Sequence, residues 1–166
     1  MTKATVWWNG PSVKQFYKIK AQPLEIGCNF ILDNRKVHHV CVYDQPTIKA
    51  IGENTHKDVQ YWTRRLYVSG AWQTFKSNIS HKKLRNMNGY CSGTMALVLA
   101  LQLGATEIDL LGCDWTLTNN SVYDKQYTWR AFPPTKHNRE KYKLFGQTRA
   151  LLQTCGLFGR ALTHNP

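Results

Sequence analysis

Short apolar runs bounded by turn-forming residues fill the first part of the chain. Residues 4–8 are rich in β-branched and aromatic side chains and end at the turn-forming residues 9–12, after which residues 13–19 can form a short helix. Residues 24–32 and 37–43 are the next apolar runs, and polar residues follow both of them. The pattern therefore predicts a strand, a turn and a short helix, followed by two more strands.

The clearest helical pattern lies at residues 92–104. It begins at Ser92, an N-cap candidate, continues through strong helix formers and ends at Gly104. Residues 107–112 then form a short strand-like run. Because the helix passes almost directly into a strand, this segment is typical of an α/β sheet.

Four further elements and one long loop complete the expected architecture. A short helix is expected to start within 47–51, with a strand at 66–68, a polar and aromatic loop at 115–136, a helix at 138–154 and a last strand at 158–162. The 166 residues suffice for one core and leave no length for a second. The predicted fold class is α/β: a single small Rossmann-like domain over residues 1–166, with a mostly parallel sheet and helices on both faces.

Composition excludes several classes of protein. Hydrophobic residues make up 42% and aromatic residues 12%, so burial can offset the lost chain entropy and global disorder is excluded. The longest apolar stretch falls short of the ~20 residues that a membrane-spanning helix needs. The N-terminal run turns polar at Asn9 before a signal-type apolar region can form, so export is not expected.

The cysteines predict neither a metal site nor a nucleophile. Their number is odd and their spacing contains no CxxC pair, so no zinc motif follows and no metal ligand is assigned. Four of them lie in apolar runs, as buried thiols of a reducing compartment do: Cys28, Cys41, Cys113 and Cys155. Cys91 precedes the predicted helix and is interpreted as a packed cysteine. The cysteines therefore favour a cytoplasmic location.

Basic charge is the most unusual bulk property. Lys and Arg number 22 against 10 Asp and Glu, which leaves a net charge of +12. The excess gathers at residues 57–90 and 125–149, and aromatic residues interleave the second tract, a combination that suits nucleotides or polynucleotides. A solvated basic surface without a ligand explains the charge equally well. The candidate anion-binding residues are Arg64, Arg65, Lys82, Lys83, Arg85, Arg130 and Lys136.

The ends of the predicted strands carry the candidate binding residues. In an open parallel sheet, ligands collect at the carboxyl ends of the strands, where turns and helix N-termini expose N–H groups. Asparagine and serine side chains there can hydrogen-bond a ligand, and glycine lets the backbone approach it, although each residue is also common in ordinary turns. The candidates are Asn9, Gly10, Ser12, Asn29, Asp44, Ser92, Gly93 and Asp114.

Four short motifs occur in a fixed order between residues 4 and 115. They are Asn-Gly-Pro-Ser at 9–12, Cys-Asn at 28–29, Ser-Gly at 92–93, and a stretch from Leu-Gly to Gly-x-Asp at 103–114. The series resembles the bacterial glycosyltransferase family 42 sialyltransferases. It is also similar to the broader group of Rossmann-like domains of unknown function, some of which resemble pterin diphosphokinases.

The resemblance implies a nucleotide-sugar donor of the cytidine type, bound along the strand ends without a further cofactor. It implies an inverting, metal-independent transfer of the sugar to a hydroxyl acceptor, with Asn9, Asn29 and Ser92 in contact with the nucleotide. His137, before the late helix, is the implied general base, since imidazole has a free pKa near neutrality. Tyr123 is implied to donate a hydrogen bond to the departing phosphate.

Two other functions fit the same sequence. A non-catalytic accessory protein, such as a viral one, could bind nucleic acid through residues 57–90 and 125–149 on the same fold. A pterin or nucleotide diphosphokinase is the second alternative, but no convincing cluster of acidic metal ligands appears. The sequence leaves the donor sugar, the acceptor and the oligomeric state open.

Overall fold

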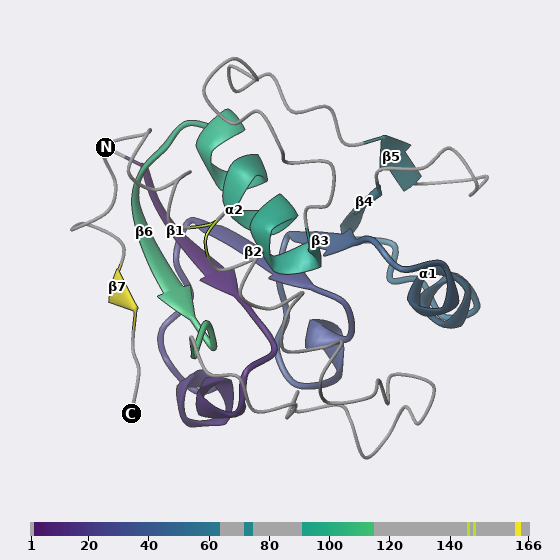
Figure 1. The fold of residues 1–166 in the computed structure, drawn as a ribbon, viewed down its shortest axis with the longest axis horizontal. Coiled ribbons are helices and arrows are strands. Elements are labelled where there is room, and N and C mark those ends of the chain that lie inside the picture. Colours follow the sequence, from purple (N-terminus) through teal and green to yellow (C-terminus); the bar gives the residue numbers. More distant parts are fainter. Residues whose placement is uncertain are drawn as a thin grey trace.

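A computed structural model describes residues 2–63, 72–74, 91–114, 146, 148 and 162–163, with the backbone alone at 72–74 and 162–163. Helices and strands alternate along residues 2–63, and further strands and a helix follow among the later described residues (Figure 1). In order they are β1 (Thr2–Trp7), the 3-10 helix η1 (Pro11–Phe16), β2 (Leu24–Cys28), the 3-10 helix η2 (Ile31–Asp33), β3 (His39–Val42), α1 (Gln45–Gly52), β4 (Gln60–Thr63), β5 (Trp72–Thr74), α2 (Ser92–Gln102), β6 (Ala105–Leu111) and β7 (Leu162–Thr163).

The described strands form one sheet in the order β5-β4-β3-β2-β1-β6-β7, and every pairing between them is parallel. From β1 the chain adds strands outward on one side as far as β5, and it then returns to the other side of β1 with β6 (Figure 1). The direction of winding therefore reverses between β1 and β6. This is the topological switch point of an open α/β sheet, and it confirms the predicted Rossmann-like fold.

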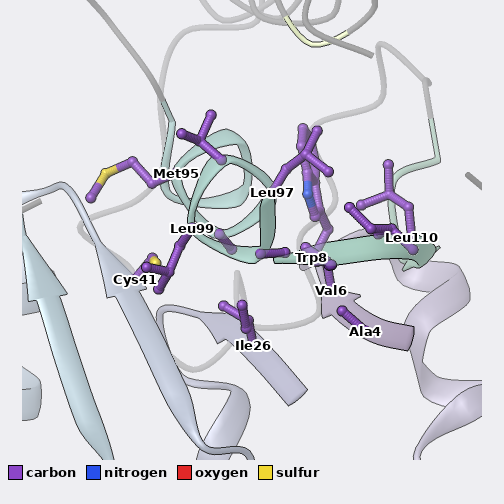
Figure 2. Packing of buried hydrophobic residues seen from close by; sticks show 14 of the residues in the cluster. Ala4, Val6, Trp8, Ile26, Cys41, Met95, Leu97, Leu99 and Leu110 are labelled. Atoms are coloured by element: carbon purple, nitrogen blue, oxygen red, sulfur yellow. The ribbon is translucent and has the colours of Figure 1, made fainter. Parts of the chain in front are cut away.

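One face of the sheet packs against α2. Alternate residues of β1 and its extension point to this helix, as the period of a strand requires, and Figure 2 shows Ala4, Val6 and Trp8 together with Ile26 of β2 and Leu110 of β6. The helix is buried from Ser92 to Ala100, which explains its nearly continuous apolar sequence. Even so, no helix in the described ranges combines the length and hydropathy needed to cross a membrane.

The opposite face packs against η1, η2 and α1. Trp7 of β1 and Val40 of β3 contribute to a second core cluster, to which the three helices add Val13, Ile31 and Ile48 respectively. The prediction of helices on both faces is thereby confirmed. Both layers are needed because the strands of a parallel sheet bury their side chains on both sides.

The predicted β2 was too long at its C-terminal end. The apolar run 24–32 was interpreted as one strand, but β2 ends at Cys28 and Asn29 adopts the left-handed conformation with φ of 53°. The chain then folds back so that Ile31 lies against Gly27, where a Cβ atom would collide with the Ile31 side chain. The run stays apolar because Ile31 is buried from η2 rather than from a strand.

Other boundaries differ by smaller amounts. Residues 13–19 were expected to be helical, whereas the 3-10 helix η1 covers Pro11–Phe16. The sequence interpretation missed β4 and β5, and the strand predicted at 66–68 lies outside the described residues. Gly146 and Thr148, both within the helix predicted at 138–154, are helical. The last strand lies at Leu162–Thr163, at the C-terminal limit of the predicted 158–162.

Candidate functional site

The motifs that lie far apart in the sequence meet at the carboxyl edge of the sheet. Tyr43, after β3, donates its backbone N–H to Ser92 Oγ at the start of α2, over 3.0 Å. Gly10, after β1, donates its N–H to the carbonyl of Gly112, after β6, over 2.8 Å. Asn29 follows the end of β2, the strand between β1 and β3. The ends of four strands and the N-terminus of α2 therefore form one connected edge at the switch point.

Ser12 and Asp114 lock the turn after β1 to the end of β6. Asp114 Oδ2 accepts the Ser12 N–H over 3.0 Å, and Asp114 Oδ1 accepts the Ser12 hydroxyl. The same contacts leave no room for a side chain at Gly10, because a Cβ atom there would collide with the Gly112 carbonyl and the Asp114 carboxylate. These contacts position the turn that carries Asn9. Direct contact of Gly10, Ser12 and Asp114 with a nucleotide stays a prediction.

Two asparagine side chains present hydrogen-bond acceptors without a partner. The Oδ1 atoms of Asn9 and Asn29 are buried, and neither has a hydrogen-bond partner among the described residues. Asn29 is only 4% exposed, so its amide is held within the edge. Leaving a buried polar atom without a partner costs about 1–3 kcal/mol. A ligand that donates two hydrogen bonds at these strand ends would remove that cost.

Trp8 adds an unsatisfied donor at the same edge. Its Nε1–H is buried and has no partner within the described part of the chain. The indole lies against Gly93 in the first turn of α2: a Cβ atom on Gly93 would be 2.5 Å from Trp8 Cε2 and 2.8 Å from Nε1. Gly93 was expected to offer its N–H to an anion, and that stays a prediction. Its missing side chain also makes room for the Trp8 ring.

The first turn of α2 has a thiol at its cap. Cys91, not the predicted Ser92, occupies the N-cap position, and Ser92 is the first helical residue. Burial raises the pKa of the Cys91 thiol and outweighs the contacts with Thr94 and with the Gly93 N–H, which lower it, while the charge of Asp44 raises it further. The thiol is therefore protonated at neutral pH, in agreement with its interpretation as a packed cysteine rather than a nucleophile.

Asp44 follows β3 and occupies the N-cap position of α1, where its side chain caps no helical N–H. It is exposed, and its charge raises the pKa of the Cys91 thiol. Its predicted contact with a nucleotide is not decided by this position. Cys28, Cys41 and Cys113 are buried as expected.

The residues proposed for catalysis and for the basic surface lie outside the described residues. These are His137 and Tyr123, together with Arg64, Arg65, Lys82, Lys83, Arg85, Arg130 and Lys136. Within the described ranges, no group of three or more His, Cys, Asp or Glu side chains could hold a metal ion.

The sequence interpretation missed Trp8 as a site residue. The alternation of side chains along β1 predicts from sequence alone that Trp8 lies on the same face of the sheet as Val6. Its proximity to Gly93 joins positions 85 residues apart (93 minus 8), so local patterns could not reveal it.

Comparisons with known proteins show a shared fold. No family model matches the chain, and no curated protein matches it. A crystal structure of the sialyltransferase CST-II in complex with a trisaccharide acceptor and CMP is similar over 93% of this chain and 78% of its own, with a TM-score of 0.50 and 14% identity. A second CST-II structure, with CMP, has a TM-score of 0.47 and 13% identity over 94% and 79% of the two chains. The protein thus has a sialyltransferase-like fold.

Proposed function

We propose that this protein is a glycosyltransferase that binds a cytidine nucleotide sugar at the carboxyl ends of β1 and β2 and transfers the sugar to a hydroxyl acceptor. The observation that carries the proposal is the pair of buried acceptors, Asn9 Oδ1 and Asn29 Oδ1, which have no partner among the described residues and follow the ends of β1 and β2. Ligands of open α/β sheets bind at this position, next to the switch point.

The arrangement matches the chemistry of a nucleotide donor. The two asparagine oxygens would accept hydrogen bonds from the amino group of a cytosine or from ribose hydroxyls. Ser92 Oγ already accepts the Tyr43 N–H, so its own hydroxyl hydrogen is the part that can be donated to a ligand. The similar solved structure of CST-II contains CMP, which supports a cytidine nucleotide over other nucleotides.

The proposed reaction is a single displacement at the sugar. The acceptor oxygen forms a bond to the anomeric carbon while the bond from that carbon to the phosphate oxygen of CMP breaks, and the hydroxyl proton passes to the imidazole of His137. Tyr123 donates a hydrogen bond to the departing CMP phosphate. The basic residues Arg130 and Lys136 offset the charge of that phosphate. Cytoplasmic nucleotide sugars would be the natural donors.

Replacing Asn29 by glycine tests the binding step. Glycine adopts a φ of 53° without strain, so Asn29→Gly removes the amide and keeps the backbone. The expected result is a roughly three- to tenfold weaker CMP affinity by calorimetry, the range of one neutral hydrogen bond. Asn54→Gly, at an exposed position after α1, is the matched control and should bind CMP like the unaltered protein.

Replacing His137 by alanine tests the chemical step. We expect His137→Ala to lose release of CMP from a CMP-sugar at neutral pH while it binds CMP with unchanged affinity. If the unaltered protein neither binds CMP nor consumes a CMP-sugar with any hydroxyl acceptor tried, the proposed function is wrong. If it does both and the Asn29→Gly variant matches it, only the assignment of Asn29 is wrong.

A further inference from the structure

The first turn of α2 offers hydrogen-bond donors to an anion. The backbone N–H groups of the first helical residues have no acceptor within a helix, and the helix dipole places partial positive charge there. In α2 these residues are Ser92, Gly93 and Thr94. Among the described residues, the sulfur of Cys91, a weak acceptor, lies near the N–H groups of Gly93 and Thr94 but does not cap the helix. A phosphate oxygen is a much stronger acceptor than a thiol.

Trp8 places a further donor on the same turn. Cα–Cβ bonds of a helix tilt toward its N-terminus, so a ring that fills the space of a missing Gly93 Cβ stands on the N-terminal side of that residue. Nε1 is 2.8 Å from the Cβ position. Because a Cβ atom is about 2.5 Å from its own backbone nitrogen, Trp8 Nε1 and Gly93 N are separated by no more than roughly 5 Å. One phosphate group can accept from both.

We propose that Trp8 is a ligand-binding residue, whose Nε1–H donates to an oxygen of a phosphate bound at the first turn of α2. The donor is buried and has no partner in the described part of the chain, so a phosphate there removes an existing energetic cost. This inference builds on the proposed function, since the phosphate of a nucleotide donor is its natural occupant. It adds a contact to the anionic group, beside the two asparagine acceptors.

The adjacent tryptophan supplies a matched comparison. Trp7 lies on the opposite face of the sheet, and its Nε1–H already donates to Glu25 Oε2 over 2.9 Å. Both Trp8→Phe and Trp7→Phe remove one indole N–H and keep most of the aromatic ring. Only Trp8→Phe removes a donor that has no partner among the described residues.

The test compares CMP with cytidine, which lacks the phosphate. We expect Trp8→Phe to weaken CMP binding about ten- to a hundredfold, the effect of one hydrogen bond to a charged group, and to leave cytidine binding within about twofold. Trp7→Phe should change neither affinity. Equal losses of CMP and cytidine affinity would mean that Trp8 only packs the site, and unchanged CMP affinity would mean that it makes no contact; either result overturns the proposal.

A second measurement uses the unaltered protein, so it tests the proposal even if the Trp8→Phe variant does not fold. In isotope-labelled protein, the Trp8 indole N–H resonance, identified by its NOEs to the Gly93 α protons, should shift downfield when CMP, ADP or pyrophosphate is added. If ADP or pyrophosphate shifts it and CMP does not, the Trp8 contact stands and the cytidine donor of the proposed function is wrong. If none of the three shifts it, the Trp8 contact is overturned, whatever sugar transfer assays show.

Discussion

Trp7 and Trp8 are neighbours in the sequence and point to opposite faces of the sheet. Only the indole N–H of Trp7 has a hydrogen-bond partner among the described residues. Trp7 Nε1 donates to Glu25 in the cluster beneath η1, whereas Trp8 Nε1 lies against Gly93 of α2 without a partner in the described residues. The first indole is a structural donor and the second is available to a ligand. Two adjacent residues of the same type, at the end of β1 and directly after it, therefore have different predicted effects when they are changed.

Trp7→Phe should lower stability without affecting ligands. The substitution removes one of the donors that solvate the buried Glu25 carboxylate, which is 1% exposed. A hydrogen bond to a charged group contributes ~1.5–3 kcal/mol, so the free energy of unfolding in urea should fall by about that amount. An unfolding free energy equal to that of the unaltered protein would show that the carboxylate finds another donor.

Arg35 should be among the residues most sensitive to truncation. Its guanidinium pairs with both oxygens of Glu25, at 3.0 and 3.2 Å, and lies 5.0 Å from the centre of the Trp7 ring. Arg35→Ala leaves the Glu25 charge buried without its main partner and should cost ~3–5 kcal/mol of unfolding free energy.

A double variant checks that the lost stability comes from the charge. Glu25→Gln combined with Arg35→Ala removes the buried carboxylate as well, so it should be more stable than Arg35→Ala alone. Urea unfolding of the double variant and of both single variants measures the difference. A double variant that is less stable by the sum of the two single effects would contradict the assignment.

Gly93→Ala should weaken both folding and nucleotide binding. A Cβ at Gly93 would be 2.5 Å from the Trp8 ring, so either the ring or the first turn of α2 must move. Overpacking of this kind costs typically ~1–3 kcal/mol. Gly52→Ala, at the end of α1, is the control, because nothing lies within 4 Å of a Cβ there and alanine is the better helix former.

Thermal unfolding and CMP calorimetry on the two glycine variants check this prediction. Gly52→Ala should unfold at the same temperature as the unaltered protein or slightly above it. If Gly93→Ala behaves like Gly52→Ala in both measurements, Trp8 does not lie against the helix as described.

Stability should fall as the pH drops below the usual pKa of histidine because of His39. Burial lowers the pKa of His39 from its usual 6.5, and the nearby charge of His38 lowers it further. As the pH falls through 6.5, the unfolded chain takes up a proton that the folded chain still refuses. The contribution of His39 to the free energy of unfolding is therefore complete above 6.5, its pKa in the unfolded chain. It is lost progressively as the pH falls from 6.5 to the lower pKa of His39 in the folded protein.

His39→Gln provides the comparison for this pH dependence. His39 Nδ1 accepts the Trp62 Nε1–H over 3.2 Å, and a glutamine side-chain oxygen can take the same role without titrating. Urea midpoints measured from about pH 8 to about pH 5 should decline less steeply for the variant. If the urea midpoints of the variant and of the unaltered protein decline equally with pH, a group other than His39 causes the loss of stability.

Much of the fold follows from local patterns. The β-branched and aromatic run at 4–8 and the run of helix formers from 92 predict β1 and α2, because both segments are buried on more than one side and are therefore apolar nearly throughout. The missed β4 shows the limit: it buries Tyr61 and Thr63 at alternate positions, but the polar residues Gln60 and Thr63 hide the hydrophobic period. The prediction of one strand over residues 24–32 was wrong because an apolar run does not distinguish a strand from a 3-10 helix.

The location of the candidate site could be predicted from the sequence, but the contacts within it could not. Strand ends that share one edge were expected, and the bond from Tyr43 N–H to Ser92 Oγ confirms that β3 and α2 meet there. Which polar atoms are satisfied depends on long-range pairs such as Ser12 with Asp114, 102 positions apart. No local pattern reveals that Ser12 is hydrogen-bonded while Asn29 Oδ1 has no partner within the described part of the chain.

The most direct measurement is thermal stabilisation of the protein by a panel of ligands: CMP, UMP, GDP, CMP-sialic acid and a short DNA. A ligand that binds the strand ends at 100 times its dissociation constant adds about 2.7 kcal/mol to the unfolding free energy. A cytidine nucleotide at the edge formed by Asn9 and Asn29 should raise the unfolding temperature selectively, and the shift should shrink in Asn29→Gly. Stabilisation by DNA alone, fading as salt is raised, would contradict a nucleotide-sugar site and favour nucleic-acid binding on the same fold.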